Sequence, residues 1–331
     1  MSLVARFATG AALLVVGAIV ACGLFWYAVA ADRSHPQASH QLVIQRGATF
    51  DEVAIQLAEG GVIGNTLTFR ILARLRDEDA AVRAGEYRFG PHVTQSDVLR
   101  ALVTGGAQVA TWVTIPEGFT AEQIAARLQN NGLGSSAALR QDFMQERLLV
   151  DGARTKSLEG FLFPSTYLMP LGAAPEQLAA LLTGQFLKEL PRDAASRARA
   201  LHVSVPQAVT VASLVEREAK SQADRPQIAA VIYNRLRLGM PLQVDATIEY
   251  ALPQHKSALS FADLRIDSPY NSYVHVGLPP TPIANPGLAS LEAAFHPAKS
   301  ENLYYVYCGN GRHAFAKTLA EHQANVTRCL Q

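Results

Sequence analysis

The sequence carries almost no net charge, since 29 lysine and arginine residues are balanced by 28 aspartate and glutamate residues. It has no stripe of basic residues, and neither a zinc-finger nor a P-loop spacing occurs. Proteins that bind nucleic acid depend on cationic surfaces, because contacts to phosphate supply much of their affinity. The composition therefore excludes nucleic acid as a main partner.

Metal-binding motifs are missing as well. The sequence contains no Cys-x-x-Cys pair and no His-Glu-x-x-His motif, and these spacings commonly hold zinc. His313 and His322 are too far apart in sequence to act as a helical pair of ligands. We expect neither a metal nor another cofactor.

Cysteine is scarce, with three residues at positions 22, 308 and 329. Cys308 and Cys329 could form a disulfide in an oxidising compartment. The pairing of cysteines cannot be deduced from their positions in a sequence. We expect these two to be unpaired and partly buried, and we leave the disulfide as the alternative.

Charge is entirely absent from the segment Phe7–Ala31. A helix of about 20 apolar residues crosses a bilayer, and Trp26 and Tyr27 near the end of this segment suit a membrane interface. The pattern predicts a transmembrane helix over residues 7–31, with residues 1–6 in the cytoplasm. We expect a single-pass protein of the cell inner membrane, with a linker at 32–40 and the remaining residues in the periplasm.

Two other interpretations of this segment stay open. Ala28-Val29-Ala30 resembles a signal-peptidase site, and Ile19-Val20-Ala21-Cys22 resembles a lipobox. The apolar run is longer than the roughly 7–15 residues of a cleavable signal. The residues that follow Cys22 also stay apolar, which is unusual for the start of a lipoprotein. We therefore expect an uncleaved anchor.

A repeat with an offset of 71 residues, marked by Thr49 and Thr120, follows the linker. In each copy a β-rich run leads to a glycine, to a threonine that can cap a helix, and to a second glycine. Apolar residues recur at helical spacing behind each threonine. Each copy therefore predicts a small β-α unit. These units resemble the LysM module, which binds N-acetylated glycans; a packing role without glycan contact is the alternative.

The rest of the chain completes an α+β pattern. Strands are predicted at 84–89 and 303–308, and helices at 96–104, 175–201, 205–219, 225–238 and 319–330. The aromatic-rich segment 158–167 suits either a rigid cleft wall or a hydrophobic connector. The segment 267–287 is dense in proline, glycine, asparagine and tyrosine, a composition typical of loops that line binding clefts.

The helix predicted at 205–219 contains two glutamates with different surroundings. Glu218 shares a face with three apolar residues, because residues three or four apart lie on one side of a helix. Glu216 lies about 200° away around the helix axis, where it can pair with Lys220. The two carboxyl groups therefore cannot point into one pocket.

Glu218 is the stronger candidate for acid catalysis. A carboxyl group on an apolar face loses hydration, which favours its neutral form. A neutral carboxylic acid near pH 7 can donate a proton to a glycosidic oxygen. A glutamate at the edge of a core that makes one hydrogen bond is the structural alternative.

Short motifs occur in a fixed order along the chain. They are Leu158-Glu159-Gly160, Ser213-Leu214-Val215-Glu216-Arg217-Glu218, Val231 to Leu236, Leu242 to Asp245, Pro269 to Tyr273, Gly277 to Pro280, Asn285-Pro286-Gly287 and His296-Pro297. Together they resemble the signature of the endolytic murein transglycosylases, the YceG-like family, from about residue 40 onwards. Val244 and Ala246 depart from the family pattern, in which threonine and proline are expected.

The resemblance implies a reaction. Such enzymes are lyases that cleave the β-1,4 bond between N-acetylmuramic acid and N-acetylglucosamine in nascent peptidoglycan. They leave a 1,6-anhydro end and so terminate elongation of the strand. The resemblance implies that Glu218 acts first as acid and then as base, without the second carboxylate that ordinary glycosidases use. Asp245, Glu249 and Asp267 are accordingly expected to be caps or surface groups.

Amide and aromatic side chains suit the hydroxyl groups and faces of sugars. The residues expected to contact substrate are Gln243, Asn234, Tyr270, Asn271, Tyr273 and Glu159, and a structural role is the alternative for each amide and tyrosine. We expect a LysM-like subdomain at 41–110, a second β-α subdomain and cleft wall at 111–199, and a mixed α/β catalytic domain at 200–331. Peptidoglycan strands and the membrane are the expected partners. An enzyme held at the membrane can reach only strands made nearby, which points to penicillin-binding synthases.

Two rival functions remain at this stage. A hydrolase that cuts the same bond would release a free reducing end instead of an anhydro end. A non-catalytic scaffold that binds the cell wall and organises synthases belongs to another functional class. The predicted position of Glu218 weighs against the scaffold.

Overall fold

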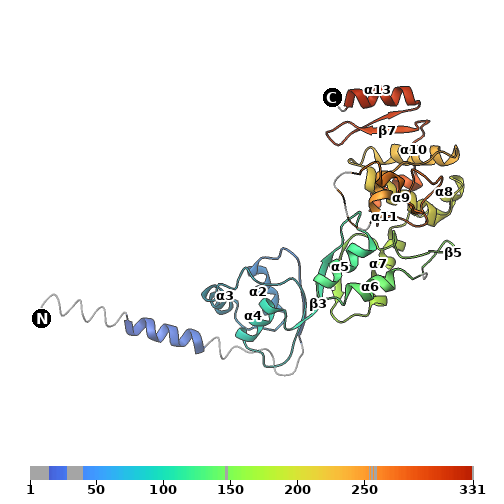
Figure 1. The fold of residues 1–331 in the computed structure, drawn as a ribbon. Helices are drawn as coiled ribbons and strands as arrows, with labels where there is room; N and C mark the ends of the chain where they lie inside the picture. The colour runs from blue at the N-terminus through green and yellow to red at the C-terminus, as the bar shows by residue number, and fades with distance from the viewer. Residues whose placement is uncertain are drawn as a thin grey trace, which may run out of the picture. The chain divides into compact units, whose positions relative to one another are not determined.

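The computed structural model describes residues 15–27, 40–145, 148–252, 254, 256 and 259–329. The chain divides into two compact units (Figure 1). Unit 1 contains the residues up to Val113 together with Leu168–Leu171, and unit 2 contains Thr114–Tyr167 and the residues from Gly172 onwards.

Residues 15–27 form an exposed helix ahead of the rest of unit 1. The predicted span 7–31 extends beyond this helix on both sides, and residues 7–14 and 28–31 lie outside the described part, as do the tail 1–6 and most of the linker. Within the described part, no helix is both long enough and apolar enough to cross a membrane.

Unit 1 alternates short strands with amphipathic helices. Its elements are β1 (His40–Ile44), α2 (Phe50–Glu59), α3 (Thr66–Leu75), β2 (Gly85–Phe89), α4 (Gln95–Thr104) and β3 (Gln108–Thr114), and its sheet has the order β1-β2-β3-β6, where β6 is Thr166–Pro170. Strand β2 pairs antiparallel with both β1 and β3. The helices bury apolar side chains in one core, where the Phe50 and Phe69 rings stack with centroids 5.4 Å apart.

The local structure that the repeat predicts is confirmed in both copies. Gly47 and Gly118 adopt φ values of +81° and +75°, a left-handed conformation that glycine tolerates best. Thr49 and Thr120 then each cap a helix of ten residues through a capping box, starting α2 and α5 (Ala121–Asn130). The copies differ in their surroundings, because β3 lies almost entirely in unit 1 whereas α5 belongs to unit 2.

Unit 2 is mainly helical. After α5 it contains α6 (Ser136–Phe143), β4 (Leu149–Val150), β5 (Ala153–Arg154), α7 (Pro175–Glu189), α8 (Ala194–Ala200), α9 (Val205–Glu218), α10 (Arg225–Arg237), α11 (Asp245–Ala251), the 3-10 helix η1 (Asp263–Arg265), α12 (Leu288–Phe295), β7 (Tyr304–Tyr307), β8 (His313–Ala316) and α13 (Leu319–Cys329). The α+β prediction is thus confirmed at the level of fold class.

One predicted helix is split in two. The single helix expected at 175–201 ends at Leu190, which has extended backbone angles, and a second helix starts at Ala194. Pro191 lies between them. Proline disfavours a helical conformation at the residue before it and lacks the N–H that a continuing helix needs. The composition rich in alanine and leucine concealed this break.

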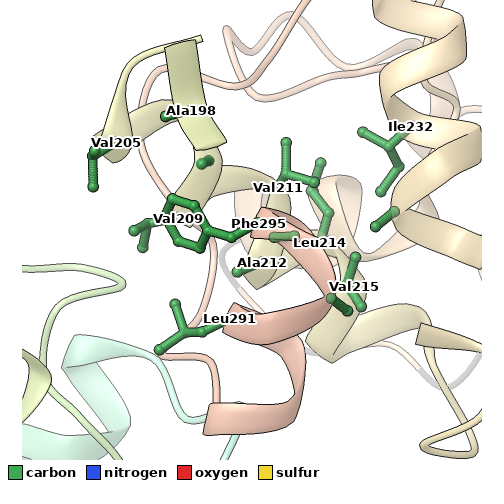
Figure 2. Close-up of a cluster of buried hydrophobic side chains, with 14 of the residues drawn as sticks. Ala198, Val205, Val209, Val211, Ala212, Leu214, Val215, Ile232, Leu291 and Phe295 are labelled. Atoms are coloured by element: carbon green, nitrogen blue, oxygen red, sulfur yellow. The ribbon is translucent and has the colours of Figure 1, made fainter. Parts of the chain in front are cut away.

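Helix α9 runs through the core of unit 2. Its residues from Val205 to Val215 are mostly buried, and they pack against α12 and α10. Figure 2 shows Phe295 and Leu291 of α12 beside Val209 and Leu214 of α9. Because α9 is held along its length, the last residue of the helix has a defined place at the edge of the core.

The β7–β8 hairpin and α13 close unit 2. Strands β7 and β8 pair antiparallel from Tyr304 opposite Ala316 to Tyr307 opposite His313. Cys308, directly after β7, forms a disulfide with Cys329 at the end of α13, so the expectation that these cysteines are unpaired is wrong. The packing of α13 on the hairpin brings together two residues that are 21 positions apart.

Candidate active site

A cleft of about 470 Å³ opens at the C-terminal end of α9. It is lined by Arg217, Glu218 and Lys220, by Asp245, Ala246 and Glu249 of α11, and by Tyr305, Val306, Tyr307 and His313 of the β7–β8 hairpin. Three carboxyl groups and two tyrosines therefore face one space. Sugars bind well to such surfaces, since carboxylates accept hydrogen bonds from hydroxyl groups.

Glu218 is the last residue of α9 and is partly buried. Its Oε2 atom accepts a hydrogen bond of 3.1 Å from the Tyr305 hydroxyl group. The pKa of Glu218 is raised to about 7, chiefly by burial and to a smaller extent by the nearby Asp245 and Glu249 carboxylates, against the opposing effects of Tyr305 and Lys220. The negative end of the helix dipole also disfavours a charge at this position. Near neutral pH, a substantial fraction of Glu218 is therefore protonated.

Tyr305 is suited to remain a donor toward this glutamate. Burial, together with the charge of Glu218, raises the pKa of Tyr305 well above its usual value. The phenol consequently stays neutral over the range in which Glu218 titrates. It can orient one carboxyl oxygen while the other remains available to substrate.

Glu216 points to a different environment, as the helical spacing predicts. It forms an ion pair of 3.3 Å with Arg225, and it accepts a hydrogen bond of 3.0 Å from the Gly287 N–H. The side chains of Glu216 and Arg225 are only 7% and 12% exposed. The expected pair with Lys220 is wrong, because α9 ends at Glu218 and the extended Ala219 breaks the i, i+4 spacing.

The carboxylates that the sequence suggested as caps or surface groups divide into two classes. Asp245 and Glu249 both line the cleft with Glu218, one helical turn apart on α11. Glu249 forms an ion pair of 2.9 Å with Arg217, and Asp245 accepts a hydrogen bond from the Tyr273 hydroxyl group. Asp267 is exposed and does not line the cleft.

Two predicted substrate contacts lie close to this cleft. The Tyr273 hydroxyl group donates to Asp245, which lines the cleft. Burial and the neighbouring Asp245 both raise the pKa of the Tyr273 phenol. Gln243 precedes α11 by two residues and has a φ of +52°. Its side-chain oxygen accepts a hydrogen bond of 3.4 Å from Arg235. Both roles as sugar contacts stay predictions.

Two other predicted contacts are buried amides with structural partners. The Asn234 side chain donates to the carbonyl groups of Ser300 and Asn302, at 2.9 Å each. The Asn271 side chain donates to Leu264 and Ile266 and accepts from the Tyr273 N–H. These hydrogen bonds give both amides structural partners, and their roles as sugar contacts stay predictions.

Glu159 and Tyr270 lie in a second polar region of unit 2. The Glu159 carboxyl group is 1% exposed and accepts hydrogen bonds from the Ala121 N–H, the Asn285 amide and the Tyr250 hydroxyl group, at 3.0 to 3.2 Å. Burial raises its pKa to about 7. The Tyr270 ring lies against Tyr250, with centroids 4.9 Å apart. We call Glu159, Asn285 and Tyr250 the buried polar cluster.

The aromatic segment next to Glu159 packs inward. Leu158, Phe161, Leu162 and Phe163 are all buried, and the described residues that line the Glu218 cleft come from other segments. Phe161 lines a different cavity of unit 2, and the role of residues 158–167 as a wall of the catalytic cleft stays a prediction. Within the described part of the chain, no group of three or more His, Cys, Asp or Glu side chains is arranged to hold a metal ion.

Sequence reasoning missed Tyr305 and the hairpin that carries it. Tyr305 lies 87 residues after Glu218, and nothing local connects the two positions. His313 on β8 also lines the cleft, with its Nδ1 atom 2.9 Å from Asp224. The one available signal was the presence of three tyrosines in the strand predicted at 303–308.

Comparison with known proteins identifies the family. The model of the YceG-like family matches residues 42–328. A protein of Bacillus subtilis named endolytic murein transglycosylase is 34% identical over 84% of this chain and 81% of its own length. One of that name from Streptococcus pneumoniae is 32% identical over 86% of this chain and 57% of its own length.

A solved structure agrees with this result. The crystal structure of a YceG-like protein from Listeria monocytogenes has a TM-score of 0.62 and 30% identity, covering 86% of this chain and 98% of that one. The family match extends over both units and includes every residue of the cleft. The chain is a member of the YceG-like family.

Proposed function

We propose that this protein is a lytic transglycosylase that cleaves the β-1,4 bond between N-acetylmuramic acid and N-acetylglucosamine in nascent peptidoglycan. The main support for this proposal is that Glu218 is a partly buried carboxyl group with a pKa of about 7 in an open cleft. The relatives named endolytic murein transglycosylase support the substrate class.

The proposed reaction uses Glu218 twice. Its protonated carboxyl group donates a proton to the glycosidic oxygen while the bond from that oxygen to C1 of the muramyl residue breaks. The resulting carboxylate then accepts the proton of the muramyl 6-hydroxyl group, whose oxygen bonds to C1. The product carries a 1,6-anhydro ring, no water is consumed, and Glu218 regains its proton.

The other acidic groups of the cleft fit this sequence of steps. Asp245 and Glu249 place two carboxylates beside Glu218, where they could stabilise the positive charge that develops at C1. Each has a partner that restrains it, Tyr273 for Asp245 and Arg217 for Glu249. Because either carboxylate could activate water, a hydrolase that cuts the same bond is the main alternative function.

Analysis of products distinguishes the two chemistries. We expect purified protein containing residues 40–331 to release muropeptides with 1,6-anhydro ends from isolated glycan strands, as measured by mass spectrometry. Internal cleavage would yield fragments of many lengths from the start of the reaction. Free reducing ends as the main product would establish the hydrolase and contradict this proposal.

The pH profile tests the role assigned to Glu218. Because the acid must be protonated, the rate should fall about tenfold for each pH unit above about 7. Tyr305→Phe removes a hydrogen bond that lowers the pKa, so the decline should begin at higher pH, with about tenfold lower activity at pH 7. Asp245→Asn removes a charge that raises the pKa, so the decline should begin at lower pH.

A matched control is available in Tyr307→Phe. Tyr307 also lines the cleft, but its hydroxyl group accepts from the Gly311 N–H. The decline with pH should therefore keep its wild-type position in this variant. Shifts of the same sign in Tyr305→Phe and Asp245→Asn would show that Glu218 is not the titrating group.

We propose further that residues 41–110 help to hold glycan, that an uncleaved N-terminal helix anchors the protein in the inner membrane, and that the cleft lies in the periplasm. The charge-free segment 7–31 and the repeated β-α unit support these proposals. Penicillin-binding synthases are the partners we expect there. In the scaffold alternative, these binding roles would persist without any cleavage.

A further inference from the structure

A second cavity, of about 570 Å³, lies toward the opposite end of α9 from Glu218. It is formed by residues 154–157 around the end of β5, by the first turns of α9, and by the loop 277–282. Thr210 on its wall is eight residues from Glu218, which corresponds to about 12 Å along the helix axis. None of the steps proposed above uses this cavity.

The polar side chains that line this cavity include two cations and one buried hydroxyl group without a described partner, besides neutral serine, threonine and glutamine side chains. Arg154 and Lys156 are exposed and have no ion-pair partner among the residues that the structure describes, and none of the lining residues is acidic. Thr155 between them is 3% exposed, and its Oγ1 atom has no hydrogen-bond partner within the described ranges. A buried polar atom without a partner is costly, so a ligand that supplies one would be favoured.

The remaining walls of the cavity are apolar or small. Phe161, Val203 and Leu278 contribute side chains, and Pro279, Pro280 and Pro282 form a rigid edge. The first turn of α9 adds the positive end of a helix dipole. An apolar cavity with a cationic rim fits a short peptide that has small side chains and free carboxylates better than it fits an uncharged sugar.

The cavity and the catalytic cleft are joined by a chain of contacts within unit 2. Thr281 on the cavity wall is 2.8 Å from the Tyr270 hydroxyl group, and the Tyr270 ring lies against Tyr250 of α11. The residue before Tyr250 on the same helix, Glu249, lines the cleft. These contacts connect the cavity wall to the helix that lines the cleft.

We propose that this second cavity binds the acidic peptide stem of the glycan through Arg154, Lys156 and the Thr155 hydroxyl group. The inference rests on the proposed function, since the stem is attached to the muramyl sugar that the cleft would hold. An extended peptide spans about 3.3–3.6 Å per residue, so four residues reach roughly the distance between Glu218 and Thr210. The cavity would select strands that carry peptides.

Binding can be measured without cleavage. The probe is a tetrapeptide stem without its sugar, titrated into the Glu218→Gln variant by calorimetry. We expect saturable binding that becomes at least about tenfold weaker when the peptide carboxylates are amidated, the effect of losing charge-assisted hydrogen bonds. The double charge reversal Arg154→Glu with Lys156→Glu should weaken binding of the unmodified peptide by at least the same factor.

Two further variants separate recognition from folding. Thr155→Val removes a hydroxyl group that has no described partner in the free protein, so its melting temperature should not fall, while peptide binding weakens about fivefold. As a control, Lys188→Glu with Arg192→Glu reverses two exposed cations of unit 2 that do not line the cavity, and should leave peptide binding unchanged.

The outcomes are distinct. Undetectable peptide binding, equal binding of the amidated peptide, or wild-type affinity in the Arg154 and Lys156 reversal would each overturn the inference. If the wild-type protein still cleaves glycan in those cases, the proposed function survives. If the peptide binds as expected but no glycan is cleaved, the proposed function fails and the cavity assignment stands.

Discussion

Replacing Glu218 with glutamine is expected to abolish cleavage of glycan strands, with a loss of at least about 1000-fold in kcat/KM. Glutamine keeps the size of the side chain and can accept from Tyr305, but it cannot donate and recover a proton. Acid–base catalysis contributes about 10²–10⁴-fold, and here one group would serve both steps. Release of anhydromuropeptides from isolated strands is the measurement.

The same substitution should make the protein more stable at alkaline pH. Burial raises the pKa of Glu218 in the folded state to about 7, so its stabilising contribution is present below about pH 4.5 and is lost as pH rises through 7. Above pH 8 the glutamine variant should gain about 2 kcal/mol, or about 5 °C in melting temperature. At pH 4 the gain should disappear.

Glu216→Gln provides the matched control one face away. It breaks the buried pair with Arg225, so the melting temperature should fall, whereas the folded protein should keep its activity within a few-fold. Above pH 8 the two variants should therefore shift the melting temperature in opposite directions, and only Glu218→Gln should lose activity. A Glu218→Gln protein with near wild-type turnover would remove Glu218 from the catalytic role.

The second large effect is expected at Asn285 in the buried polar cluster. Its oxygen accepts from the N–H groups of Gly160 and Leu162, and its amide donates to Phe119 and to Glu159, at 2.8 to 3.0 Å. Asn285→Ala removes four hydrogen bonds and leaves the Gly160 and Leu162 N–H groups without their described acceptor. We expect a loss of about 4 kcal/mol of stability, or about 10 °C in melting temperature.

Asn131→Ala serves as the comparison for this loss. The Asn131 side chain makes one described hydrogen bond, of 2.8 Å, to the Arg127 carbonyl group near the end of α5. Its removal should cost about 1 kcal/mol or less. If Asn285→Ala melted within 2 °C of Asn131→Ala, the buried polar cluster would not hold these loops together.

The parts of the site that could be predicted from sequence are those fixed by local geometry. Helical spacing alone separates Glu216 from Glu218, and α9 places them in different environments. The capping threonines and left-handed glycines of the repeat are equally local, because each turn is specified by residues within a few positions. These features needed no knowledge of what packs against them.

The parts that could not be predicted depend on contacts between distant segments. Arg225 replaces Lys220 as the partner of Glu216 because α9 stops one residue after Arg217. Tyr305 reaches Glu218 only when the hairpin folds back, and the Cys308–Cys329 disulfide requires α13 to lie on that hairpin. Asn285 joins segments 123 to 166 residues away, and a lone asparagine in a loop gives no sign of such a role.

The sheet of unit 1 has a practical consequence for anyone who wishes to isolate either unit. Its fourth strand, β6, comes from residues 166–170, whereas the chain between β3 and β6 builds part of unit 2. Removing residues 41–110 would thus take away most of β1, all of β2 and the first three residues of β3. The rest of β3 would stay beside β6 with an exposed edge, which promotes aggregation. A glycan-binding test of unit 1 therefore calls for a permuted chain in which residues 166–171 are spliced, through a short flexible connector, to the end of β3.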